Sequence, residues 1–300
     1  MRALVTGATG FVGKRLLSRL ECPVVLSRDA PAARARLGSE VQVVAWDPQQ
    51  EPAPLDAFAD IDVVFHLAGE SLASGRWTAA KKARIRDSRV LGTRNLTDAI
   101  RQLARKPQVL VSASAIGYYG DRGDEILDET APPGGDFLGE VCAAWEREAQ
   151  AVAEAGVRVV NVRIGLVLAK DGGALPKMLT PFRLGLGSPL GSGRQWMSWI
   201  HVDDLIGLLL LAADRGDLSG PLNATSPQPV TNREFTKALG RAIRRPTLLP
   251  AVPVGVLRLV LGELASVLLT SQRVLPRRAQ EAGYTFAHCE LEDTLQNLSH

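Results

Sequence analysis

The glycine spacing near the N-terminus constrains the fold of this chain more than any other feature. Three glycines, Gly7, Gly10 and Gly13, follow a short apolar stretch and lead directly into residues with helical spacing. In such a turn, Gly7 permits a tight bend, Gly10 lets the backbone approach a pyrophosphate, and Gly13 lets the helix pack against the strand. The start of the helix then offers free N–H groups and a positive dipole end to an anion. We therefore expect a nucleotide-binding turn, rather than a purely structural one, formed by Gly7, Thr9, Gly10, Phe11, Val12 and Gly13.

Short β-branched stretches alternate with longer stretches of helical periodicity over the first half of the chain. This alternation predicts an α/β fold of the Rossmann type, in which helices cover both faces of a doubly wound parallel sheet. The expected strands are 3–6, 24–27, 41–45, 63–67, 109–112 and 157–163, and the expected crossover helices are 13–20, 78–103 and 137–155.

The second half of the chain differs in composition, with more glycine and proline and less regular alternation. A glycine- and proline-rich loop covers 170–193, with a short helix expected over 175–184, and three prolines lie between 246 and 253. These features predict a nucleotide-binding domain over 1–245 and a small α-rich C-terminal domain over 246–300. The smaller, substrate-side lobe is expected to come mainly from 170–300.

The charge balance argues against nucleic acid as a partner. The chain carries 35 basic and 32 acidic residues, mixed along the sequence. The basic segment 272–278 has no interleaved aromatic residues, which is typical of a solvated face. Two apolar segments, 205–213 and 251–270, are too short or too charged to span a membrane, so we expect both to be buried helices.

The cysteines indicate neither a disulfide framework nor a metal site. Cys22, Cys142 and Cys289 lie far apart and form no CxxC pair. An odd number of isolated cysteines is typical of a reducing compartment. Since Met1 leads straight into a strand-like stretch without the pattern of a secretory signal, we expect a cytoplasmic protein.

The end of the second strand predicts which dinucleotide is bound. An acidic residue there would bond the ribose 2′-hydroxyl of NAD(H), whereas an arginine would accept the 2′-phosphate of NADP(H). Arg28 has the expected spacing and Ser27 adds a hydroxyl donor, so NADP(H) is preferred. Asp29, one position later, leaves NAD(H) possible, and Arg28 could also be a solvated surface charge.

Four motifs occur in the order found in the extended short-chain dehydrogenase/reductase superfamily. They are TGATGFVG (6–13), DVVFHLAG (62–69), SASA (112–115) and WIHVDDL (199–205). The chain further resembles an atypical subgroup, the nucleoside-diphosphate-sugar epimerase-like proteins with an added C-terminal domain. Its marks are AGE (68–70), GYYG (117–120), DFLGEVCAAWE (136–146) and QRVLPRR (272–278), so the resemblance covers essentially all 300 residues.

The resemblance implies an NADP(H)-dependent oxidoreductase or epimerase that acts on a small carbonyl, alcohol or nucleotide-sugar-like substrate. It also implies further cofactor contacts. Asp47 would lie by the adenine, and Leu166 would face the nicotinamide. The residues implied to line the ribose and pyrophosphate are Leu67, Ala68, Gly69 and Glu70.

The standard catalytic residues of the superfamily are only partly present. In the family mechanism a serine polarises the substrate oxygen, a tyrosine shuttles the proton, and a lysine one turn later holds the ribose. Ser114 fits the first role. The helix that should supply the pair reads Phe137 and Val141 instead, and no lysine occurs between Pro107 and Ala169.

A substitute proton shuttle must therefore be sought elsewhere. Tyr118, four residues after Ser114, is our candidate, although a packed aromatic with a hydrogen-bonded hydroxyl is the plainer interpretation. Tyr119 and Glu140 are weaker candidates. The missing pair also motivates an alternative function, a non-catalytic NADP(H)-sensing regulator that binds a protein partner.

Aromatic and basic residues gather between the glycine-rich loop and the following apolar helix. An arginine beside tryptophans suits an anionic or planar ligand. The resemblance places this stretch near the substrate, which gives Arg194, Trp196, Trp199 and His201 as candidate substrate contacts. The alternative is that Trp199 is core and that His201 is a structural histidine at a strand end. A protein partner or a homo-oligomer remains open.

Overall fold

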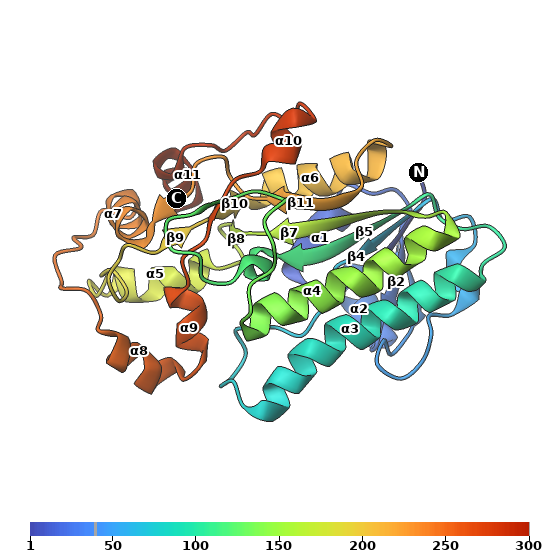
Figure 1. The fold of residues 1–300 in the computed structure, drawn as a ribbon, viewed down its shortest axis with the longest axis horizontal. Coiled ribbons are helices and arrows are strands. Elements are labelled where there is room, and N and C mark those ends of the chain that lie inside the picture. Colours follow the sequence, from blue (N-terminus) through green and yellow to red (C-terminus); the bar gives the residue numbers. More distant parts are fainter. Residues whose placement is uncertain (39–40, 300) are drawn as a thin grey trace.

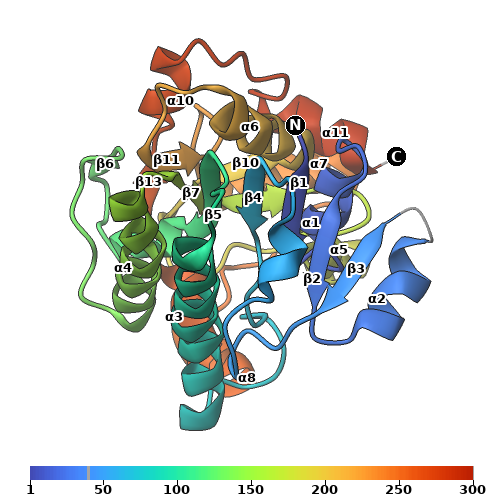
Figure 2. The same ribbon diagram turned by 90° about the vertical axis from the view of Figure 1, so that its right-hand side faces the viewer.

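A seven-stranded sheet forms the centre of the molecule. The computed structural model describes residues 1–38 and 41–299. All neighbouring strands of the sheet pair in parallel, in the order β11-β7-β5-β4-β1-β2-β3 (Figures 1 and 2). Its strands are β1 (Ala3–Thr6), β2 (Val24–Ser27), β3 (Gln42–Ala45), β4 (Val63–His66), β5 (Val109–Ala115), β7 (Arg158–Ile164) and β11 (Gly220–Ala224).

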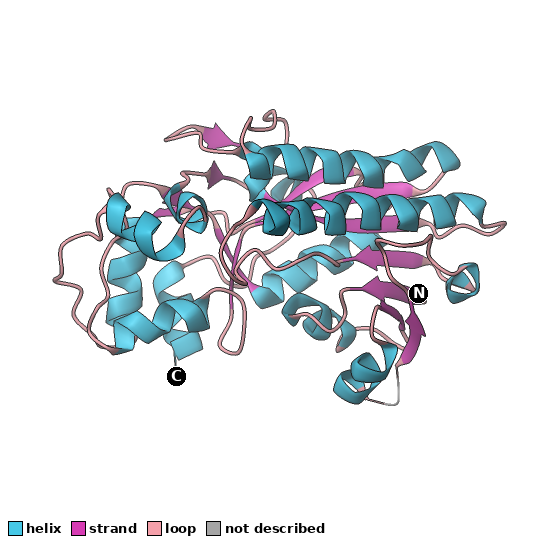
Figure 3. Cartoon of the chain, turned by 90° about the horizontal axis from the view of Figure 1, so that it is seen from below, coloured by secondary structure: helices cyan, strands magenta, loops and turns pink. Residues whose placement is uncertain are grey.

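Helices cover both faces of this sheet, as a doubly wound fold requires. The two long helices α3 (Ala79–Gln102) and α4 (Phe137–Gln150) lie side by side on one face (Figure 3). Helices α1 (Phe11–Leu17) and α6 (Val202–Asp214) pack together in the core of the other face. Helix α2 (Ala30–Leu37) connects β2 to β3. The Rossmann-type fold expected from the sequence is therefore confirmed.

Side-chain caps set where several of these helices begin. The Thr78 hydroxyl accepts a hydrogen bond from the Lys81 N–H at the start of α3, and Asp136 accepts one from the Gly139 N–H at the start of α4. Because the first N–H groups of a helix have no partner within it, a cap stabilises each start by about 1 kcal/mol. Both capped helices begin within a residue of the positions expected from the sequence.

The remaining elements extend the carboxyl end of the sheet. Three two-stranded ladders pair β8 with β10, β9 with β12, and β6 with β13. The last of these returns the C-terminal segment to the nucleotide-binding half. The bounds are β6 (Ile126–Leu127), β8 (Leu166–Leu168), β9 (Trp196–Met197), β10 (Trp199–His201), β12 (Val230–Thr231), β13 (Arg273–Val274), α5 (Leu175–Arg183), α7 (Asn232–Ala242), α8 (Val254–Leu261), α9 (Leu264–Leu269), α10 (Arg277–Glu281) and α11 (Leu291–Ser299).

The expectation that 251–270 is a buried helix was wrong. The segment forms two short helices, α8 and α9, which are separated at Gly262, where φ is +61°. The side chains of Leu259 and Val260 are 78% and 63% exposed. Each helix is too short to bury more than a narrow stripe, and Leu257 is the buried residue of α8. By contrast, 205–213 lies in α6 and is largely buried, as expected.

The edge strand β11 escaped the sequence analysis. Its sequence, GPLNA, contains three residue types that are rare in strands, so it gives no β-branched signal. Pro221 is tolerated because β11 is an edge strand that pairs with β7 alone. Among the helices of the described residues, none combines the length and the apolar character needed to cross a bilayer.

A buried histidine joins the carboxyl ends of β1 and β4. His66 Nδ1 lies 2.7 Å from the Thr6 hydroxyl, and its Nε2 lies 2.9 Å from the hydroxyl of Thr93 on α3. The Thr6 oxygen also accepts the N–H of Ala68, which leaves its own proton to donate to Nδ1. Full burial lowers the pKa of His66 to about 4, so the ring is neutral at physiological pH.

Replacing this histidine should change how stability depends on pH. Because the pKa of His66 is about 4 in the folded state and 6.5 when exposed, the unfolded state binds the extra proton between these values. The free energy of unfolding should therefore fall as the pH drops from 6.5 to 4, by about 3 kcal/mol more than in His66→Gln. Urea unfolding of both proteins across this range measures the difference. Parallel pH profiles would contradict the assignment.

Candidate functional site

The glycine turn between β1 and α1 leaves room above the start of the helix. Gly7 has φ +70°, and a Cβ on it would lie 2.6 Å from the Leu67 carbonyl carbon, so a side chain cannot be accommodated. A Cβ on Gly13 would collide with the carbonyl oxygen of Gly7. A Cβ on Gly10 would meet only the Gly7 oxygen, at 3.1 Å. The turn thus packs tightly on its inner side and is open at Gly10, where an anion could approach the helix N-terminus.

A cavity of about 380 Å³ opens beside this turn, within the usual size range of small-ligand sites. It runs over the carboxyl ends of β1 and β2 and is closed by the segment that follows β4. The candidate cofactor residues that line it are Gly7, Thr9, Gly10, Ser27, Arg28, Leu67, Ala68, Gly69 and Glu70. The sequence thus identified residues from three separate loops that the fold brings together.

The other candidate cofactor residues lie outside this lining. Gly13 lies under the turn, Val12 is in the first turn of α1, and the Phe11 ring covers Gly172. The Asp47 carboxylate accepts the N–H of Gln49, and it is Pro48 and Gln49 that reach the cavity. Leu166 lies on β8, where it pairs with Trp199 of β10.

Two arginines, Arg28 and Arg36, line the end of the cavity beyond β2. Arg36 was missed by the sequence analysis, because its place on α2 becomes relevant only when the helix folds back beside Arg28. The Asp29 carboxylate, which had kept NAD(H) open, caps α2 by accepting the Ala32 N–H at 2.9 Å. This end of the cavity therefore has two exposed guanidinium groups, and its one carboxylate is already hydrogen-bonded to the start of α2. Such an arrangement suits a phosphate.

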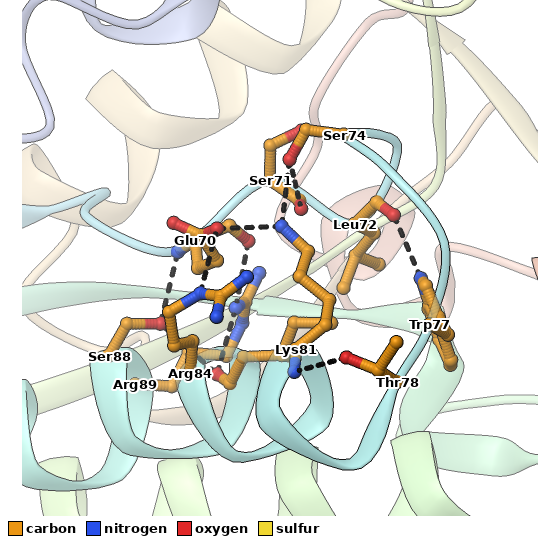
Figure 4. Close-up of polar contacts among 11 residues, drawn as sticks. Glu70, Ser71, Leu72, Ser74, Trp77, Thr78, Lys81, Arg84, Ser88 and Arg89 are labelled. Atoms are coloured by element: carbon orange, nitrogen blue, oxygen red, sulfur yellow. Dashed lines mark hydrogen bonds and ion pairs between the residues drawn. The ribbon is translucent and has the colours of Figure 1, made fainter.

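Glu70 lies on the opposite wall, and its charge is compensated within the protein. Lys81 Nζ, which is buried, donates to the Glu70 carboxylate at 2.6 Å and to the Ser74 hydroxyl at 2.7 Å (Figure 4). The hydrogen bond from Lys81 is the main reason that the pKa of Glu70 is lowered, and Arg84 and Arg28 add to it. Glu70 is therefore a charged acceptor that can bind hydroxyls, while Lys81 limits its repulsion of nearby phosphates.

Ser114, at the end of β5, is held by a buried ion pair. Its hydroxyl donates to Glu146 Oε1 at 2.6 Å, and Arg163 binds both oxygens of the same carboxylate at 2.8 Å. We expected Ser114 to donate to a substrate oxygen. Because its proton is committed to Glu146 in this arrangement, the Ser114 oxygen can instead accept a proton from a hydroxyl donor.

The two tyrosines after Ser114 have different environments. Tyr119 is fully buried, its hydroxyl donates to Asn223 at 2.7 Å, and burial raises its pKa to about 12. The Tyr118 ring lies 3.5 Å from the Arg163 guanidinium carbon, and its hydroxyl has no hydrogen-bond partner within residues 1–38 and 41–299. The free hydroxyl of Tyr118 makes it a better proton-shuttle candidate than Tyr119.

Helix α4 carries no proton-transfer group at the two positions where the family mechanism uses tyrosine and lysine. Phe137 packs edge-on against Trp77 with ring centres 5.7 Å apart, and Val141 is buried. Glu140 is exposed on the outer face of the helix. A lysine of α3 lies beside this end of α4, since Lys82 Nζ is 5.4 Å from the Phe137 ring centre.

The four candidate substrate residues differ in exposure: Trp199 and His201 are buried, Trp196 is partly buried and Arg194 is exposed. Trp199 is completely buried in the core and its indole N–H donates to the Gln228 carbonyl, so it is a core residue and is not exposed to a substrate. Arg194 is exposed on the loop before β9. Trp196 is partly buried; its indole N–H donates to Asp124, and Arg273 of the C-terminal segment stacks 4.3 Å from its ring centre.

His201 is largely structural in its contacts. It is 6% exposed, caps α6 by accepting the Asp203 N–H, and stacks on His288 with ring centres 3.7 Å apart. Burial, followed by the neighbouring His288, lowers its pKa. Potential ligand atoms of His201, Asp203 and His288 lie within 4.8 Å of one another, a grouping that the sequence did not suggest.

Relatives of this chain occur in bacteria, plants and mammals. An epimerase family protein of Mycobacterium leprae is 38% identical over 294 residues, which cover 97% of this chain and 93% of the relative. A chloroplastic epimerase family protein of Arabidopsis thaliana, a homolog of SDR39U1, is 41% identical over 307 residues, with 99% and 86% coverage. The crystal structure of human epimerase family protein SDR39U1 (isoform 2) with NADPH matches 100% of this chain and 99% of its own, with a TM-score of 0.88 and 33% identity.

Family models match almost the whole chain. The model of the NAD dependent epimerase/dehydratase family covers residues 3–224, and a domain of unknown function, DUF1731, covers residues 252–298. The first match includes the glycine turn, the cavity and the Ser114 cluster, whereas the second includes α8, α9 and the segment that packs on Trp196. This chain belongs to the NAD dependent epimerase/dehydratase family, with a C-terminal DUF1731 domain.

Proposed function

We propose that this protein binds NADP(H) and acts as an oxidoreductase or epimerase on a substrate with a hydroxyl or carbonyl group. The observation that carries the proposal is the cavity beside the glycine turn, with Arg28 and Arg36 at one end and the open Gly10 in its floor. The human relative whose structure contains NADPH supports the choice of dinucleotide. NAD(H) is the weaker alternative, because Asp29 caps a helix.

The residues present fit such a cofactor. Gly10 leaves the helix N-terminus open to the pyrophosphate, the two arginines suit a 2′-phosphate, and Glu70 can accept from ribose hydroxyls. When bound, the dinucleotide supplies hydride transfer to or from a carbinol or carbonyl carbon. The protein must then bind the substrate oxygen and move its proton.

The Ser114 cluster suggests how the proton is handled. Ser114 donates to Glu146, so its oxygen is oriented to accept from a substrate hydroxyl. Arg163 pairs with Glu146 and also lies against the Tyr118 ring, so one guanidinium contacts both the partner of Ser114 and the tyrosine with the free hydroxyl. We infer that Tyr118 exchanges the proton while Ser114 orients the substrate oxygen.

A non-catalytic NADP(H)-sensing role is the second candidate, and α4 favours it. Phe137 and Val141 occupy the positions of the standard proton shuttle and ribose-binding lysine, and neither side chain can replace them. In that case cofactor occupancy would change a surface that binds a protein partner.

A substrate panel separates the two functions. Protein loaded with NADPH or NADP⁺ would be tested for cofactor turnover against nucleotide sugars and small aldehydes, ketones and alcohols. Turnover of any class supports an enzyme. Cofactor binding without turnover across the panel, together with a partner that is captured only from the cofactor-loaded protein, would support the sensor.

The cofactor preference should depend on the two arginines. Arg28→Glu replaces attraction to the 2′-phosphate with repulsion, so NADPH affinity should fall by about 100-fold or more while NADH affinity changes little. Arg36→Ala should cause a smaller loss in the same direction. Calorimetric titration of both dinucleotides measures these ratios.

The matched control is Arg34→Ala. Arg34 lies on α2, as Arg36 does, but its guanidinium donates to the Val43 carbonyl. We expect this variant to leave the NADPH to NADH ratio unchanged. If Arg28→Glu also leaves this ratio unchanged, the 2′-phosphate is bound elsewhere.

Ser114 and Tyr118 should affect turnover without affecting cofactor binding. Ser114→Ala removes the oxygen that orients the substrate, and Tyr118→Phe removes the proposed shuttle but keeps the stacked ring. Each should lower turnover of a panel substrate by roughly 100-fold. NADPH affinity, measured in parallel, should stay within experimental error. Wild-type turnover in both variants would refute the catalytic assignment.

A further inference from the structure

Helix α4 has no lysine that could donate hydrogen bonds to the nicotinamide-side ribose. Val141 stands at the position of the standard lysine and has no donor. The neighbouring face of α4, formed by Cys142 and Trp145, packs toward α3, and the two helices lie side by side along the same face of the sheet (Figures 2 and 3). A side chain from α3 can therefore reach the space that a lysine on α4 would otherwise occupy.

Arg89 of α3 lies between the segment after β4 and Trp145 of α4, which is four residues after Val141. Its guanidinium carbon would lie 3.1 Å from a Cβ on Gly69, so the absence of that Cβ is what admits the group against the segment after β4. The same carbon lies 5.1 Å from the ring centre of Trp145 on α4. The residue before it, Ser88, lines the cofactor cavity, and its hydroxyl accepts the Glu70 N–H from the same segment (Figure 4).

The contacts of Arg89 use only part of its hydrogen-bonding capacity. Nη1 donates to the carbonyl oxygens of Glu70 and Ile85 at 3.1 and 3.0 Å. Within residues 1–38 and 41–299, Nε and Nη2 have no acceptor and no carboxylate forms an ion pair with the group. The Glu70 carboxylate pairs with Lys81 and Arg84 instead.

The unused Nε and Nη2 donors of Arg89 are available to a further hydrogen-bond acceptor. Burial lowers the pKa of Arg89, which means that its charge is poorly solvated. The indole N–H of Trp145 beside it is also buried without a partner among the described residues. Arg89 itself is only partly buried, so its two unused nitrogen donors remain open to a ligand. Because buried donors are normally satisfied, the orphan N–H of Trp145 beside these open donors indicates a ligand that brings oxygen acceptors.

The position along the sheet identifies which half of the dinucleotide is involved. The two phosphate-binding arginines lie beyond β2, on one side of the glycine turn, whereas Arg89 lies beyond β4 and next to the helix that covers β5. A dinucleotide lies across the crevice at the point where the strand order reverses, with its halves on opposite sides. Arg89 therefore lies on the nicotinamide side.

We propose that Arg89 takes the place of the missing lysine and donates through Nε and Nη2 to the hydroxyls of the nicotinamide-side ribose. The assignment rests on the proposed NADP(H) binding. The cation comes from α3 instead of α4, so the sequence spacing of the standard pair gives no sign of it. Gly69 is part of this arrangement, because any larger residue would displace the guanidinium.

Three probes test the assignment on Arg89→Met by calorimetric titration. They are NADPH, 2′,5′-ADP, and adenosine 2′-phosphate 5′-diphosphate, which has two 5′-phosphates but no second ribose. We expect NADPH affinity to fall about 10- to 100-fold, as for loss of charged hydrogen bonds, while the other two affinities are unchanged. Arg89→Lys should lose less, since lysine also donates to hydroxyls.

The matched control is Arg94→Met, on the same helix. Arg94 also joins α3 to α4, through a two-point ion pair with Glu148, but lies on the exposed surface. It should leave all three affinities unchanged. Thermal unfolding without ligand checks that each variant is folded.

Other outcomes would overturn the assignment in distinguishable ways. Equal losses for all three probes would mean that Arg89 only holds the Glu70 segment in place. A loss shared by NADPH and the diphosphate probe would move its contact to the pyrophosphate. Unchanged NADPH affinity in Arg89→Met would remove its role altogether. If the wild-type protein binds neither NADPH nor 2′,5′-ADP, the proposed cofactor itself is wrong.

Discussion

The close approach of the β1 turn to the end of β4 is the constraint on which the rest of the site depends. Gly7 fits against the backbone of Leu67 and Ala68 only because it has no side chain. The buried His66, bonded to Thr6 and Thr93, holds the two strand ends and α3 at this separation. Since the cavity is bounded by the turn on one side and the post-β4 segment on the other, a shift in this contact would change its width.

Charge compensation explains how the site can attract an anion without being held together by one. Lys81 is buried against Glu70, and Arg163 is buried against Glu146, so both of these carboxylates have a cation of their own. Buried ion pairs of this kind are costly to break, since removing one partner leaves an unpaired charge. The cations that remain without carboxylates, Arg28 and Arg36 at one end and Arg89 at the other, are the ones available to a ligand.

The sequence predicted the parts of this protein whose signal is local. The glycine turn, six strands of the sheet and the long helices follow from residue spacing, because strand and helix periodicity and turn geometry act over a few neighbouring residues. The edge strand β11 was missed since Gly220, Pro221 and Asn223 give no strand signal and only pairing with β7 makes them one. The segment that forms α8 and α9 was expected to be buried because it is rich in apolar residues. The composition of a segment does not reveal whether another part of the chain packs over it, and several apolar side chains here are exposed.

The sequence by itself determined the fold class, because the alternation of strand and helix periodicity is visible along the chain, and it determined the glycine turn and the absence of a tyrosine and lysine on α4, because each of these is a single contiguous motif. Only the tertiary structure decided which side chains lie near the two α4 positions that lack tyrosine and lysine. Ser114 meets Glu146 and Arg163 across 32 and 49 positions of sequence, and Arg89 of α3 lies against Trp145 of α4. Such contacts depend on how helices pack against the sheet, and packing joins residues whose separation along the chain carries no periodic signal.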